Sequence, residues 1–141
     1  MNNESLSVLL VDDDDVACES VIRGFKKGEI KFPVIIAGDG QEALDILRNK
    51  HAEKKIEGKY IILLDLNMPC MNGFEFLKEV RADESLSSAV IFVLTTSSAD
   101  ADRIRAYEEN IAGFMIKSKL GPQFSKLASL LSHYHETVKL P

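Results

Sequence analysis

The chain lacks the features of several protein classes. Its 141 residues hold only two cysteines, Cys18 and Cys70, too few for a disulfide scaffold and without the CxxC spacing of a metal site. No apolar run approaches the ~20 residues that a membrane span needs. The net charge is −5, and no basic stripe is present that would neutralise nucleic-acid phosphates. These absences predict a protein that contacts neither membrane nor nucleic acid.

The first residues also lack a basic region followed by an apolar stretch, so no secretory signal is expected and the predicted location is the cytoplasm. The rest of the composition is ordinary for a globular protein, with 45% hydrophobic and 28% charged residues in a chain long enough to bury a core. The sequence therefore predicts one domain over residues 1–141, with no internal repeat.

Apolar runs of strand length alternate with segments of helical period along the whole chain. This alternation predicts βαβ units and a parallel sheet, and hence an α/β fold. A doubly wound five-stranded sheet in the order 2-1-3-4-5 would place the first and third strands side by side. The expected strands are residues 6–11, 33–37, 60–64, 89–95 and 113–117, and the expected helices are residues 14–27, 40–50, 73–81, 99–109 and a long last helix from about 122.

Two of these strands end on acidic residues. The bulky apolar run Tyr60–Leu64 suits a strand buried on both faces, and it stops at Asp65. The first strand runs into Asp12 and Asp13. Because the two strands are neighbours in the predicted order, these carboxylates are expected at one edge of the sheet, where open α/β folds place their chemistry. Carboxylates packed so closely require a cation or a proton.

An all-oxygen site with two or three protein ligands suits Mg²⁺, or Mn²⁺ in its place. Asp13 and Asp65 are the expected direct ligands, Asp12 would act through water, and the backbone carbonyl of Asn67 would complete the set. Such a site favours phosphoryl chemistry, in which Asp65 can itself be the nucleophile and form an acyl phosphate.

The other two strand ends supply partners for a phosphoryl group. A transferring phosphoryl group needs hydroxyl donors and a cation for its equatorial oxygens. The fourth strand ends at Thr95, which offers a hydroxyl, and the fifth ends at Lys117, which offers an ammonium. Each residue alone is unremarkable, but the four strand ends together form a specific pattern.

This pattern resembles the receiver domains of bacterial two-component response regulators, in particular single-domain regulators like the chemotaxis regulator. The resemblance covers about residues 6–132 and implies a flavodoxin-like receiver fold. It implies that Asp65 accepts a phosphoryl group from a sensor histidine kinase. The matching segments are Val11-Asp12-Asp13, Leu64-Asp65-Leu66-Asn67-Met68-Pro69 with Asn72-Gly73, Leu94-Thr95 and Ile116-Lys117.

By the same resemblance, Asp12, Asp13 and the Asn67 carbonyl hold the metal, and Thr95 and Lys117 contact the phosphoryl group. Phe114 falls at the position of the switch aromatic, which rotates inward once the threonine moves to the phosphate; a plain core aromatic is the alternative. Asn67 and Ser97 fall at the positions that tune autodephosphorylation.

The carboxyl-terminal segment resembles regulators that accompany bacterial phytochrome histidine kinases. Without an attached effector domain, output is expected through protein contact, including a homodimer on the face of the fourth helix, fifth strand and fifth helix. The apolar residues beyond Leu131 are the expected basis of that dimer, and His133 and His135 are expected to face solvent.

Ser118 departs from the family pattern, which has proline joined by a cis bond after the conserved lysine. A cis bond before serine would cost roughly 2.5–4 kcal/mol, against ~0.5–1 before proline. The Lys117–Ser118 bond is therefore either trans in a differently shaped loop, or cis and strained.

Two other functions stay open at this point. The chain could be a receiver-like binding module that is never phosphorylated, or a small Mg²⁺-dependent phosphohydrolase. Such hydrolases carry an acid/base aspartate two residues after the nucleophile, and Asn67 stands there instead. The sequence therefore predicts a protein that is not an enzyme beyond its own phosphorylation and autodephosphorylation.

Overall fold

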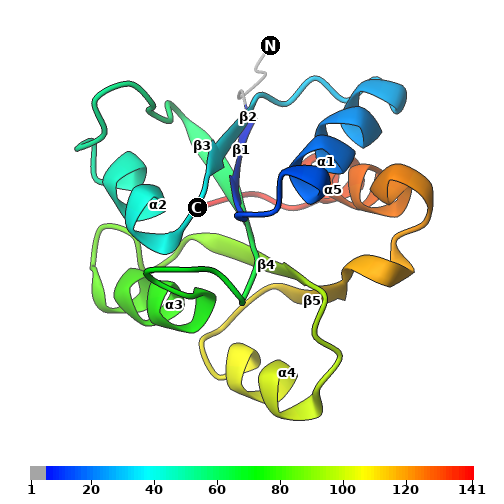
Figure 1. Cartoon of the computed structure of the whole chain (residues 1–141). Helices are drawn as coiled ribbons and strands as arrows, with labels where there is room; N and C mark the ends of the chain where they lie inside the picture. The colour runs from blue at the N-terminus through cyan, green and yellow to red at the C-terminus, as the bar shows by residue number, and fades with distance from the viewer. Residues whose placement is uncertain (1–5) are drawn as a thin grey trace.

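Five parallel strands form one sheet in the order β2-β1-β3-β4-β5 in the computed structural model, which describes residues 6–141 (Figure 1). This order confirms the doubly wound topology predicted from the sequence. The apolar composition of the strands explains their central position, because a parallel sheet is covered by helices on both faces. The strands are β1 (Leu6–Val11), β2 (Val34–Ala37), β3 (Lys59–Leu64), β4 (Val90–Thr95) and β5 (Gly113–Ile116).

Five α-helices alternate with the strands, also as predicted. The last helix begins at Ser125 rather than near Pro122, because a 3₁₀ turn, Pro122–Phe124, precedes it and Phe124 has a positive φ of 51°. A second 3₁₀ turn, Lys117–Lys119, follows β5. The helices are α1 (Asp15–Lys27), α2 (Gly40–Leu47), α3 (Gly73–Ala82), α4 (Asp100–Tyr107) and α5 (Ser125–Thr137).

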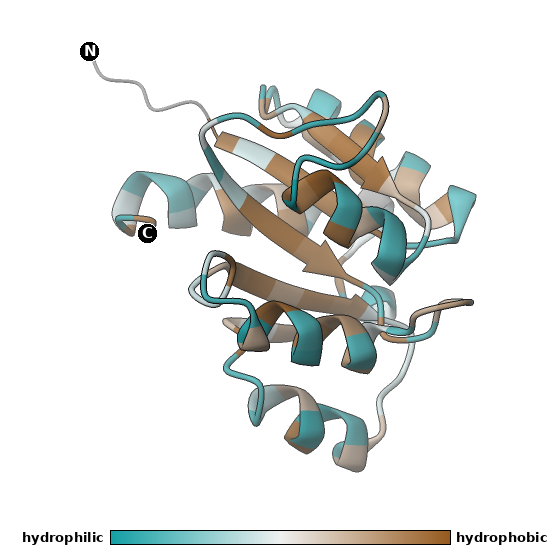
Figure 2. Cartoon of the chain, turned by 90° about the vertical axis from the view of Figure 1, so that its left-hand side faces the viewer, coloured by the Kyte–Doolittle hydropathy of each residue, from teal (hydrophilic) through white to brown (hydrophobic). Residues whose placement is uncertain are grey.

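Two hydrophobic clusters lie on opposite faces of the sheet. Alternate residues of each strand serve opposite faces, so Leu9 and Ile62 join the cluster with α2, α3 and α4, whereas Leu10 and Ile61 join the cluster with α1 and α5. Figure 2 shows the strands as the most hydrophobic part of the chain. None of the helices in residues 6–141 has the length and hydropathy needed to cross a membrane.

The carboxyl-terminal segment packs inward, which corrects two expectations. Tyr134 stacks edge-on against Phe92 with ring centroids 5.3 Å apart, and Leu140 is buried. The apolar residues beyond Leu131 therefore serve mainly the core rather than an open dimer face, and only Val138 among the large ones is exposed. His135 is half-buried because its ring packs edge-on against Phe32, with ring centroids 5.2 Å apart; His133 is exposed as expected.

Candidate functional site

The sheet register brings three carboxylates together. Val11 pairs with Leu64, and the Asp65 N–H donates to the Val11 carbonyl at 2.9 Å, so the residues after β1 and β3 lie side by side. Carboxylate oxygens of Asp12, Asp13 and Asp65 all lie within 4.8 Å of one another. Among residues 6–141 this is the one group of acidic, histidine or cysteine side chains with the spacing of a metal site.

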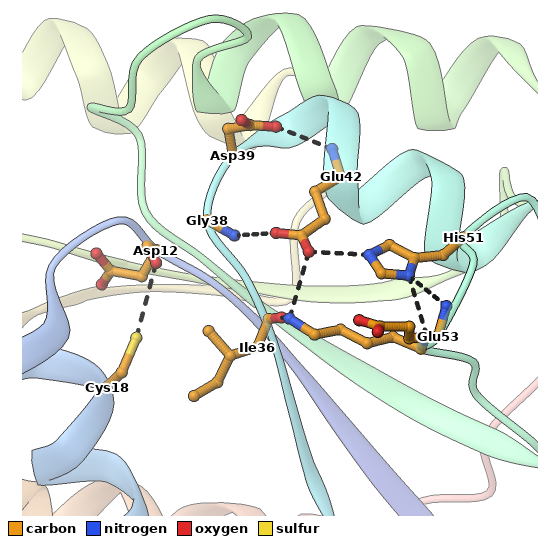
Figure 3. Close-up of polar contacts among 9 residues, drawn as sticks. Asp12, Cys18, Ile36, Gly38, Asp39, Glu42, His51 and Glu53 are labelled. Atoms are coloured by element: carbon orange, nitrogen blue, oxygen red, sulfur yellow. Dashed lines mark hydrogen bonds and ion pairs between the residues drawn. The ribbon is translucent and has the colours of Figure 1, made fainter.

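The turn after β1 is fixed by hydrogen bonds. The Asp12 N–H donates to Ala37 at 3.0 Å, and Asp12 Oδ1 accepts from the Asp14 N–H at 2.9 Å. Cys18 reaches back from α1, with its Sγ 3.7 Å from the Asp12 carbonyl (Figure 3). Burial raises the pKa of the Cys18 thiol to about 11, with the charge of Asp12 acting in the same direction, so the group stays a thiol. Asp12 is thus held by its backbone, and its Oδ2 is left to face the site.

Lys117 enters this acidic cluster from the end of β5. Its Nζ lies 2.8 Å from Asp12 Oδ2 and 3.8 Å from Asp65 Oδ2, and only 9% of its side chain is exposed. Burial opposes the ammonium, but the ion pair with Asp12 and the charge of Asp65 outweigh it and raise the pKa of Lys117. The lysine therefore stays charged and neutralises one of three carboxylates. The structure contains no cis peptide bond in residues 6–141, so the Lys117–Ser118 bond is trans.

The same carboxylates retain capacity for a cation. Burial raises the pKa of Asp12, against the influence of Lys117. Its Oδ2 is near Lys117 in distance, but no donor is aligned with it for a hydrogen bond, and it is the one buried side-chain polar atom in residues 6–141 with that property. Asp13 is exposed. Hard oxygen ligands with a net negative charge are what Mg²⁺ or Mn²⁺ requires, so the donor set fits such an ion.

The loop after Asp65 makes a very close approach to α3. A Cβ on Gly73 would lie 2.6 Å from the Asp65 carbonyl oxygen, so only glycine fits there. Asn72 begins α3 with a capping box, in which its side chain accepts from the Glu75 N–H and the Glu75 side chain accepts from the Asn72 N–H, both at 2.9 Å. The backbone N–H of Asn67 lies 3.5 Å from Asp65 Oδ1. These contacts fix the main chain on which Asp65 stands.

The remaining predicted residues come from β4 and β5. Thr95 is fully buried at the end of β4, and its Oγ1 accepts from the Ser97 N–H at 3.3 Å. Ser97 is half-buried, whereas Asn67 is exposed. Phe114 is half-buried and packs against the hydrophobic cluster that α2, α3 and α4 cover. The structure therefore brings the four strand ends to one edge of the sheet.

The sequence analysis missed a polar network beneath α2. Glu42 Oε1 accepts from the Gly38 N–H at 2.8 Å, and Oε2 contacts His51 Nε2 at 3.0 Å and Lys54 Nζ at 3.3 Å (Figure 3). His51 Nδ1 accepts two backbone N–H groups, at Glu53 and Lys54, so its neutral ring carries its hydrogen on Nε2. The network joins the loop before β3, which carries His51 and Lys54, to Gly38 in the loop after β2. The one sequence signal for this network is Glu42 itself, an acidic residue three positions after Asp39, which is the spacing of a helix start.

Comparison with known proteins identifies the family. Residues 8–126 match the response regulator receiver domain. This chain belongs to that family. The receiver domain is 32% identical to response regulator Rcp1 of Synechocystis sp. over 141 residues, covering 99% of this chain and 96% of Rcp1. Receiver domains are signalling switches rather than classical enzymes, which argues against the phosphohydrolase alternative.

Three solved structures share the fold of this receiver domain. The Mn²⁺-bound form of Rcp1 has a TM-score of 0.83 at 32% identity, covering 97% of this chain and 99% of that one. A two-component response regulator from Legionella pneumophila has a TM-score of 0.79 at 36% identity, covering 94% and 100%. The phosphorylated cyanobacterial phytochrome response regulator RcpA has a TM-score of 0.86 at 25% identity, covering 99% of each chain.

Proposed function

We propose that this receiver domain is a phosphorylation-dependent signalling switch in which Asp65 accepts a phosphoryl group from a sensor histidine kinase. The observation that carries the proposal is the position of Asp65: a buried carboxylate beside two further acids, with Lys117 Nζ 3.8 Å away. An isolated buried carboxylate would be a destabilising feature. A cluster of three with one ammonium suits a group that brings its own negative charge together with a cation.

In the proposed reaction an Asp65 carboxylate oxygen attacks the phosphorus of a phosphohistidine on the kinase. The new oxygen–phosphorus bond forms as the nitrogen–phosphorus bond breaks, and the imidazole leaves with the electron pair. Lys117 and the Thr95 hydroxyl would neutralise and orient the phosphoryl oxygens. Bound Mg²⁺ or Mn²⁺, held by Asp12, Asp13, Asp65 and the Asn67 carbonyl, would supply the positive charge that this transfer needs.

We propose further that the switch is coupled to a phytochrome-type kinase and that its output is protein–protein contact. The likeness to the phosphorylated cyanobacterial phytochrome response regulator RcpA supports this coupling. Phe114 would be the switch aromatic, and Asn67 and Ser97 would tune autodephosphorylation. The cytoplasm is the proposed location, because a phosphorylating kinase domain must reach Asp65.

A homodimer through the α4-β5-α5 face is also proposed. The large apolar side chains available to such an interface are Ile104 and Tyr107 of α4, which are 56% and 47% exposed, and Leu130 of α5. Scattered exposed apolar residues are common, so their number alone decides nothing. Light scattering with and without a phosphoryl mimic tests the dimer, and a monomer in both conditions would exclude it.

The central test is the intact-protein mass after incubation with acetyl phosphate and Mg²⁺. We expect one phosphoryl group on the wild type, lost on hydroxylamine treatment, and none on Asp65→Asn. Omitting Mg²⁺ should abolish the addition on the wild type. No addition with any donor would instead support a receiver-like module that works by fixed binding.

A further inference from the structure

Ser97 is held by an acidic side chain of the following helix. Its Oγ donates to Asp102 Oδ2 at 2.6 Å and accepts from the Ala99 N–H at 3.3 Å. The short distance is typical of a hydrogen bond to a carboxylate, which is about twice as strong as one between neutral groups. Because a hydroxyl has a single hydrogen, the donor of Ser97 is fully engaged by Asp102.

The same residue holds Thr95. The Ser97 N–H donates to Thr95 Oγ1 at 3.3 Å, and Thr95 is fully buried. β4 lies next to β3 in the sheet, so Thr95 lies at the edge that carries Asp65. Since Thr95 Oγ1 accepts the Ser97 N–H, its own hydrogen remains available for another acceptor. Asp102, the Ser97 hydroxyl and backbone N–H, and the Thr95 hydroxyl thus form a continuous series of contacts from α4 to the site.

We propose that Asp102 is a positioning residue for the phosphorylation of Asp65. It fixes Ser97, the Ser97 amide in turn fixes the Thr95 oxygen, and the Thr95 hydrogen is thereby kept free for a phosphoryl oxygen. A donor that is already oriented requires no reorganisation when the phosphoryl group arrives. The inference rests on the proposed function, and it assigns to Asp102 a role that works through Ser97 and Thr95 without contact to the reacting atoms.

A purely structural role for Asp102 is the alternative, because acids in the first turn of a helix stabilise it through its dipole. Asp100 provides a matched control. It lies in the same turn of α4, it is also acidic, and it accepts from Arg103 at 2.9 Å. Among the hydrogen bonds of residues 6–141, none joins Asp100 to Ser97. A dipole effect would therefore appear in variants of both acids, whereas positioning of Ser97 depends on Asp102 alone.

The experiment measures the initial rate of phosphorylation by acetyl phosphate with Mg²⁺, followed by intact-protein mass. Loss of an oriented donor costs about 10²–10³-fold in rate, so its misplacement should cost roughly three- to tenfold in Asp102→Ala and Ser97→Ala. Asp102→Asn should restore most of the rate, since an amide oxygen still accepts from Ser97. Asp100→Ala should react like the wild type. The double variant Asp102→Ala/Ser97→Ala should be no slower than either single variant, because both substitutions remove the same Ser97–Asp102 hydrogen bond.

Hydrogen exchange of the Ser97 amide, followed by NMR, tests the link without phosphorylation. Protection should fall in Asp102→Ala and persist in Asp102→Asn and Asp100→Ala. An unchanged rate in Asp102→Ala, or an equal loss in Asp100→Ala, would overturn the inference. If the wild type accepts no phosphoryl group, the proposed function itself is contradicted. Unchanged amide protection in Asp102→Ala would then independently overturn the positioning of Ser97.

Discussion

Helices α3 and α4 follow one another along the chain and cover the same face of the sheet, but they are anchored differently. α3 begins with the capping box of Asn72 and buries Phe76, Leu77 and Val80 almost completely. α4 has no side-chain hydrogen bond from its N-cap, and Ala106 is the one buried residue within it. The helix that starts on the Asp65 loop is therefore held by burial. The helix that starts on the Thr95 loop has little apolar area to hold it.

Polar contacts replace burial at α4. Arg105 lies over the Phe74 ring with its guanidinium carbon 4.0 Å from the ring centroid, which joins α4 to the first turn of α3. An exposed contact of this kind stabilises by about 0.5–1 kcal/mol. The Asp102–Ser97 hydrogen bond is the second such contact. A helix with few contacts and little buried apolar area can shift at small free-energy cost, which suits a surface that responds to the state of the site.

The largest expected difference between the two helices is in their contribution to stability. Phe76→Ala in α3 should lower the free energy of unfolding by about 3–5 kcal/mol, because it leaves a cavity at a fully buried site. Ile104→Ala in α4 should change it by less than ~0.5 kcal/mol, since Ile104 is 56% exposed. Urea denaturation followed by circular dichroism measures both. A loss above ~1.5 kcal/mol for Ile104→Ala would mean that α4 is as well packed as α3.

A smaller difference is expected at the helix starts. Asn72→Ala should destabilise the protein by about 1 kcal/mol, because it removes the cap of α3. Ala99→Asn should stabilise it by up to about 1 kcal/mol, because Ala99 has the extended backbone of an N-cap, with φ −67° and ψ 132°. Thermal unfolding of the wild type and of both variants measures these two changes in stability. No gain in stability in Ala99→Asn would show that a side chain at this position does not cap α4.

The smallest effect concerns α2, which is held by a charged network. The hydrogen bond from the Gly38 N–H lowers the pKa of Glu42 against the effect of burial, and His51 and Lys54 lower it further. A carboxyl whose pKa is lower in the folded state stabilises above its ordinary value, 4.5, and loses that contribution as the pH falls through the folded value. The wild type should therefore exceed Glu42→Gln in stability by less at acid pH than at neutral pH.

Urea denaturation of the wild type and of Glu42→Gln, at acid and at neutral pH, measures this change in the stability difference. The effect should be well under 1 kcal/mol, because the side chain of Glu42 is about one third exposed and its ion pair with Lys54 is screened by solvent. A difference that stays constant with pH would show that the network contributes through its shape rather than its charge.

Strand runs and their acidic ends were predictable from the sequence because they are local. The apolar run that ends at Asp65, the run that ends at Asp12, and the turn residues between them do not depend on distant neighbours. The strand order followed, since the handedness of βαβ units leaves few topologies. The predicted strand order and the parallel sheet were therefore confirmed.

Contacts between distant residues were not predictable in the same way. The apolar residues beyond Leu131 suggested an interface, but the tail returns to the sheet, where Lys59 Nζ donates to the Leu140 carbonyl at 2.9 Å. Glu42, His51 and Lys54 are scattered in a polar stretch, and nothing in their spacing indicated that both His51 and Lys54 contact the same carboxylate.

The sequence by itself determined the helices and strands, their order, and the edge of the sheet that carries Asp12, Asp13 and Asp65. The reason is that hydrophobic periodicity and strand length are local properties of the chain. Only the tertiary structure decided which groups meet within that edge. Lys117 lies closer to Asp12 than to Asp65, and Asp102 reaches Ser97, because the register of the sheet and the packing of α4 fix these distances. A hydrogen bond depends on tenths of an ångström, which residue spacing along a chain does not specify.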